Sequence, residues 1–141
     1  MPTPRRLLSA AVGKDGRIYA IGGSSTTINF PGVTPLATVE AFDPVAQQWS
    51  AVPDMPTARA QPGAALGADG LLYVMGGLKS AALAVVEAYD VTTSTWKTVA
   101  PMQVASSCPG GTAAPHADPV YAVGGTGSAT QTYYTASMIW N

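Results

Sequence analysis

The chain has 141 residues, of which 47% are hydrophobic and 11% are charged, and its formal net charge is −1. A length near one domain with this apolar content allows a packed core, whereas near-neutral charge without a basic block argues against nucleic acid and anionic membranes as partners. One Cys and one His exclude a disulfide or a Cys/His zinc site within one chain, so we expect no metal and no cofactor.

The first residues do not read as a targeting signal. Arg5 and Arg6 are followed by two leucines, but the chain then becomes small and polar where a signal peptide would continue as an apolar run. No stretch reaches the roughly 18 apolar residues that suggest a membrane span. We therefore expect a soluble protein without signal peptide or transmembrane segment, and its compartment is left open.

Residues 1–54 are predicted to form four short strands. Small residues lead through the turn at 13–17 to an apolar run of strand length, which a glycine pair closes. A third strand carries Phe42, and Trp49 follows seven positions later in the fourth. Scattered Gly and Pro interrupt every helical period, which indicates an all-β class.

The same pattern returns in residues 55–101 and, one residue shorter before its glycine pair, in residues 102–141. Each unit again places an aromatic residue seven positions before a Trp. The first unit is longer mainly because residues 24–37 form an insertion between its glycine pair and its aromatic residue. Repeat folds absorb length variation in loops of this kind.

A glycine pair after an aromatic-bearing strand, then an aromatic residue and a Trp seven apart, in units of about 50 residues, resembles the kelch repeat. The resemblance covers essentially the whole chain. It implies a β-propeller in which each unit is one four-stranded blade, with blades at 1–54, 55–101 and 102–141 and the last outer strand cut short. The repeated structural positions are Trp49, Trp96, Trp140, Gly22, Gly23, Gly76, Gly77, Gly124 and Gly125.

Propellers usually have 4–8 blades, so three blades would leave apolar flanks exposed. We expect two chains to complete a six-bladed ring as a homodimer. The alternative is that the chain is a fragment of a longer propeller.

Two pairs of charged residues recur at matching positions. Arg5 and Arg59 occupy one position of the first two units, and Glu40 and Glu87 occupy another. In the third unit these positions hold Ser106 and Gln131, so both charges disappear together. We therefore predict that each Arg pairs with the Glu of its unit, because losing one partner alone would strand a charge.

Strand direction places the segments between units and the loops after the glycine pairs on one side of the molecule, which we call the loop face. Loops on a rigid frame often carry function. The candidate ligand-binding residues are on or near this face: Arg6, Asn29, Phe30, Arg59 and Gln61.

No catalytic arrangement is evident. His116 has no nucleophile motif beside it, and Cys108 is expected to be a small buried hydrophobic residue. The leading hypothesis is a non-enzymatic scaffold that binds a protein through the loop face. The alternatives are a carbohydrate-binding or carbohydrate-active propeller subunit, and a structural half-propeller without a ligand of its own.

Overall fold

The computed structural model describes residues 1–26, 32–114, 118–126, 130–134 and 139–141. These residues form three four-stranded antiparallel sheets, each with its strands in chain order, which confirms the predicted all-β class. The first sheet holds β1 Ser9–Val12, β2 Ile18–Ile21, β3 Val39–Asp43 and β4 Gln48–Val52. The second holds β5 Gly63–Leu66, β6 Leu72–Met75, β7 Val86–Asp90 and β8 Thr95–Val99. The third holds β9 Gly110–Ala113, β10 Pro119–Val123, β11 Gln131–Tyr134 and β12 Ile139–Trp140.

The strand registers show that the three repeats are structurally equivalent. Each aromatic residue of the third strand pairs with the Trp of the fourth: Phe42 with Trp49, Tyr89 with Trp96, and Tyr133 with Trp140. The described residues of β12 are Ile139 and Trp140, and the truncation of the third outer strand stays a prediction. The blade limits themselves stay a prediction, because the sheets do not define where the connecting segments divide.

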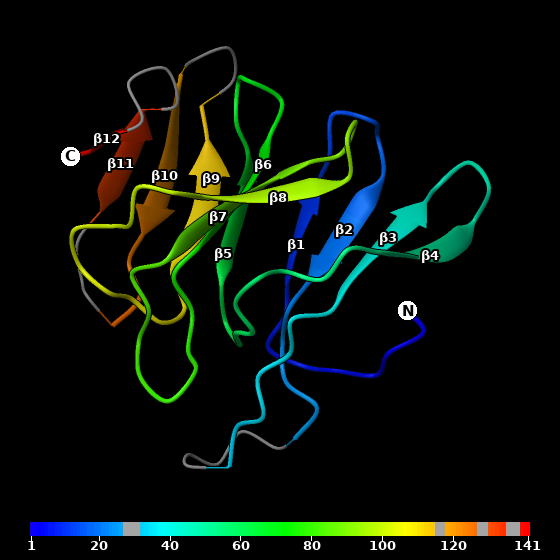
Figure 1. Cartoon of the computed structure of the whole chain (residues 1–141), viewed down its shortest axis with the longest axis horizontal. Coiled ribbons are helices and arrows are strands. Elements are labelled where there is room, and N and C mark those ends of the chain that lie inside the picture. The colour runs from blue at the N-terminus through cyan, green and yellow to red at the C-terminus, as the bar shows by residue number, and fades with distance from the viewer. Residues whose placement is uncertain (27–31, 115–117, 127–129, 135–138) are drawn as a thin grey trace.

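The first strands of the three sheets lie side by side (Figure 1). β1 contacts β5, and β5 contacts β9. These strands read SAAV, GAAL and GGTA, and their small side chains allow close approach. The approach is tightest at Gly111, where a methyl group would overlap the backbone of Ala64.

Two apolar clusters join the sheets. Tyr19 of the first sheet meets Tyr89 of the second with ring centroids 5.9 Å apart, and Tyr73 of the second meets Tyr133 of the third at 5.4 Å. Each cluster also contains aliphatic residues from both of the sheets that it joins. The core of the molecule therefore lies between sheets, and aromatic pairs of this geometry stabilise beyond their buried area.

Each Trp of the second and third sheets also bonds to the preceding repeat. The indole N–H of Trp96 donates to the Pro53 carbonyl, and that of Trp140 to the Ala100 carbonyl, both at 2.8 Å. Trp49, in the outer strand of the first sheet, has no such partner among the described residues.

Candidate functional site

The buried Arg59 organises the start of the second repeat. Its Nη2 donates to Oε2 of Glu87 on β7 at 2.5 Å, and its Nη1 donates to the carbonyls of Gly76 and Val85 at 3.0 and 2.9 Å. The Thr57 hydroxyl donates to the other oxygen of the same carboxylate at 2.7 Å. Burial lowers the pKa of the Arg59 guanidinium, and the adjacent Glu87 carboxylate acts in the opposite direction. The Arg59–Glu87 pair thus fixes the segment that precedes β5 against β6 and β7, the two middle strands of the second sheet.

The first repeat builds the same arrangement. Arg5 Nη1 donates to Glu40 Oε2 at 2.7 Å, its Nη2 donates to the Ala20 carbonyl at 3.0 Å, and the Thr3 hydroxyl donates to Glu40 Oε1 at 2.8 Å. Both predicted Arg–Glu pairs are therefore confirmed. Each lies within one repeat.

The third repeat replaces the ion pair by uncharged groups. Oε1 of Gln131 accepts from the Val104 amide, and its Nε2 donates to the Val104 carbonyl, both at 2.9 Å. The Ser106 hydroxyl donates to the Gly124 carbonyl at 3.1 Å. These bonds explain why both charges can disappear together, since neither site leaves a buried ion without its partner.

A hollow of about 460 Å³ opens beside the first repeat on the loop face, lined by Pro4, Arg5, Arg6, Ser24 and Ser25. Two of these lining residues, Arg6 and Ser24, exchange backbone hydrogen bonds of 3.1 and 2.8 Å. The Arg6 side chain is exposed, whereas Arg5 is held by Glu40. The hollow is therefore polar, with one exposed cationic group that is available to a ligand.

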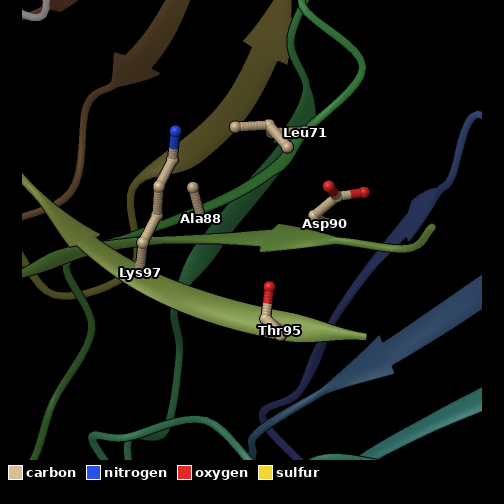
Figure 2. A pocket seen from close by; sticks show the side chains of 5 residues that line it. All are labelled: Leu71, Ala88, Asp90, Thr95 and Lys97. Carbon is tan, nitrogen blue, oxygen red and sulfur yellow. The ribbon is translucent and has the colours of Figure 1, made fainter. Parts of the chain in front are cut away.

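A second hollow, of about 130 Å³, lies on the second sheet (Figure 2). Figure 2 shows Leu71 from the segment just before β6, Ala88 and Asp90 from β7, and Thr95 and Lys97 from β8. Asp90 accepts from the Thr92 amide at 2.8 Å and lies 3.5 Å from Lys14 Nζ. Ligand pockets usually measure 300–1,000 Å³, so this hollow is small for a molecule of that class.

The model of the Kelch motif family matches residues 5–56 and 62–103. The chain belongs to the kelch repeat family. Repeats of this family commonly mediate protein–protein interactions, and the family is generally non-enzymatic. The human Kelch repeat and BTB domain-containing protein 13 is 44% identical over 57 residues, which make up 39% of this chain and 11% of that relative. The alignment thus spans about a tenth of the relative's length.

The kelch fold places the predicted ligand-binding residues in different environments. Arg6 lines the larger hollow, and Gln61 is half-buried, with its backbone N–H donating to the Leu7 carbonyl at 2.7 Å. Arg59 is 0% exposed and its side chain is engaged by Glu87 and two carbonyls, so we assign it to the kelch frame and no longer to a ligand. Asn29 and Phe30 lie outside the described residues.

Three features of the kelch repeats were not foreseen from the sequence. Thr3 and Thr57 complete the hydrogen bonding of the buried carboxylates, and Ser25 lines the hollow. The Thr residues could have been found, because they occupy the same position two residues before each Arg. Ser25 had no comparable signal, since it belongs to the insertion that only the first repeat carries.

The expectation that Cys108 is buried was wrong. The residue is exposed and its thiol is free, because it lies in the connecting segment before β9 and not within a sheet. Partial burial nevertheless raises the pKa of this thiol, which favours its uncharged form at neutral pH.

Among the residues that the structure describes, no three His, Cys, Asp or Glu side chains gather closely enough to hold a metal ion. His116 lies outside that set. No helix within the described ranges has the length and hydropathy needed to cross a membrane.

Proposed function

We propose that the chain is a non-enzymatic kelch-type scaffold that binds a protein partner through the loop face, with the hollow around Arg6 as the centre of contact. The observation that carries the proposal is the position of this hollow. It is built between two segments that the buried Arg5–Glu40 pair and the Arg6–Ser24 backbone bonds hold in place. A preformed surface reduces the entropy lost when a partner binds.

The positive charge in the hollow indicates which kind of partner it could bind. Glu40 neutralises Arg5 inside the sheet, so the exposed Arg6 guanidinium is the cationic group that remains for the partner. A guanidinium binds carboxylates through two parallel hydrogen bonds. We therefore propose that the partner presents an Asp- or Glu-containing segment to this hollow. The described residues that line the hollow include no aromatic ring on which a sugar could stack.

A peptide library displayed on phage tests this proposal. Peptides selected on the wild-type chain are expected to be enriched in Asp and Glu, and Arg6→Glu is expected to weaken their binding about tenfold or more because like charges then face each other. Lys97→Glu is the matched control, since it makes the same change of charge on β8 and should leave binding unchanged. Peptides that bind Arg6→Glu as well as the wild type, or a melting temperature raised by glycans alone, would contradict the proposal.

We also propose that the chain self-associates as a homodimer that completes a six-bladed ring. What supports this is the exposure of apolar residues on the two outermost sheets, including Ile18 and Val123. In a closed propeller the equivalent residues of successive blades are covered by a neighbouring blade, so we propose that a second copy covers them here.

A further inference from the structure

The outer side of the third sheet, which we call the front flank, repeats a surface that is buried elsewhere in the molecule. Register places Val123 at the position of Ile21 and Met75. Ile21 and Met75 are 1% and 0% exposed because each faces the following sheet, whereas Val123 is 44% exposed. Tyr121 occupies the position of Tyr19 and Tyr73 and is only partly covered.

The outer side of the first sheet, the back flank, is the complementary surface. Ile18 corresponds by register to Leu72 and Val120, which are 1% and 0% exposed because each faces the preceding sheet. Ile18 itself is 38% exposed. Phe42 stands at the position of Tyr89 and Tyr133, whose rings pack on a tyrosine of the preceding sheet. The back flank thus presents the residues that a front flank contacts inside the molecule.

The backbone hydrogen bonds between repeats also recur at equivalent positions and leave groups unpaired at the two ends of the molecule. The Gln61 amide donates to the Leu7 carbonyl at 2.7 Å, and the Cys108 amide donates to the Gln61 carbonyl at 3.1 Å. All three residues have positive φ, of 58°, 52° and 57° for Leu7, Gln61 and Cys108, so they form one series at equivalent positions. At the ends of this series, the Leu7 amide and the Cys108 carbonyl have no partner within the described ranges.

A second series behaves in the same way. The Gly23 amide donates to the Arg59 carbonyl at 3.0 Å, and the Gly77 amide donates to the Ser106 carbonyl at 2.9 Å. The next donor would be the Gly125 amide and the preceding acceptor the Arg5 carbonyl, and both lack a partner in the described part of the chain. Among the described residues, each flank therefore has one free backbone donor and one free backbone acceptor, and each of them matches a free group on the other flank.

We propose that a second copy of this chain covers both flanks, docked head to tail, so that the front flank of each copy packs on the back flank of the other. The proposal rests on the self-association proposed above and specifies its geometry. The Leu7 amide of one copy then donates to the Cys108 carbonyl of the other, and the Gly125 amide donates to the Arg5 carbonyl. Two equivalent interfaces continue the packing already present between the repeats. A back-to-back or front-to-front dimer would instead bring two surfaces of the same kind together.

Two charge substitutions test the geometry by sedimentation equilibrium of the full chain. Wild type is expected at twice the chain mass of 14.3 kDa. Ile18→Glu damages only the back flank and Val123→Glu only the front flank. Each should raise the dissociation constant about 100-fold or more, because a charge would be buried without a partner. An equal mixture of the two variants should recover part of this association, because the mixed dimer has one intact interface and one that carries both charges, whereas a dimer of either variant alone has a charge in both interfaces.

Val45→Glu is the matched control, because Val45 is 94% exposed in the β3–β4 turn and should leave the dimer intact. Circular dichroism verifies folding of all three variants, whose substituted side chains are accessible in the single chain. A dimer that only one flank variant weakens would overturn the head-to-tail arrangement while leaving self-association standing. A monomeric wild type would overturn both proposals and assign the flanks to other repeats.

A disulfide provides a second measurement that does not depend on association strength. Leu7→Cys is expected to cross-link to the native Cys108 of the other copy under mild oxidation, giving a covalent dimer in a denaturing gel. The variant carrying both Leu7→Cys and Cys108→Ser should give none. Gln61→Cys is the internal standard, because its bond to Cys108 within one chain has the equivalent geometry. A cross-link in the standard without one in Leu7→Cys would overturn the head-to-tail contact.

Discussion

Glu87→Ala is expected to lower the free energy of unfolding by about 3–5 kcal/mol, because it leaves the buried Arg59 guanidinium without its counter-ion. Arg59 is 0% exposed, so water cannot replace the lost carboxylate without opening the sheet. Arg59→Ala alone should also be costly, since it strands the carboxylate and frees the carbonyls of Gly76 and Val85. Urea unfolding followed by circular dichroism measures each change.

The double variant carries the decisive information. Removing both partners is expected to cost much less than the sum of the two single changes, with an interaction energy of about 2–3 kcal/mol. Lys14→Ala is the control, because Lys14 is exposed, Asp90 is partly exposed and the two lie 3.5 Å apart, and an ion pair at the surface contributes little. Additive costs for Arg59 and Glu87 would show that the two residues stabilise the chain independently, against the pairing seen in the structure.

Gly111→Ala is expected to destabilise the chain by about 3 kcal/mol, at the upper end for overpacking, because its methyl group meets the Ala64 backbone and not a side chain that could move aside. Gly110→Ala is a close control on the same strand. The nearest atom to its new methyl group, the Val123 carbonyl oxygen, lies at an ordinary contact distance of 3.6 Å. Thermal unfolding compares the two variants. Equal melting temperatures would mean that β5 and β9 do not approach each other as described.

The repeated sequence made much of this architecture predictable. Strand pairing followed from the fixed spacing between an aromatic residue and a Trp, and the register of Tyr89 with Trp96 confirms it. The Arg–Glu pairs were predictable because both charges are lost together in the third unit. In each case three copies of one motif turned a weak local signal into a specific one.

Features carried by the backbone were not predictable in this way. Leu7, Gln61 and Cys108 occupy one structural position, yet their side chains share no property, because the bonds between repeats use only amides and carbonyls. The exposure of Cys108 was also not predictable from its residue type. Cysteine is commonly buried, but this residue lies in a connecting segment, which the side chain does not indicate. The hollow at Arg6 depends on an insertion found in one repeat, so no second copy could reveal it.

Amide hydrogen exchange at Gly23 and Gly77 tests most directly whether successive repeats stack through the same contacts. Each amide donates across a repeat boundary, to the carbonyls of Arg59 and Ser106. Both are expected to exchange as slowly as global unfolding allows, whereas Lys14, which is exposed in a turn and whose amide has no partner among the described residues, should exchange rapidly. Rapid exchange at Gly23 and Gly77 together, in a chain that keeps its strand content, would contradict the stacked arrangement.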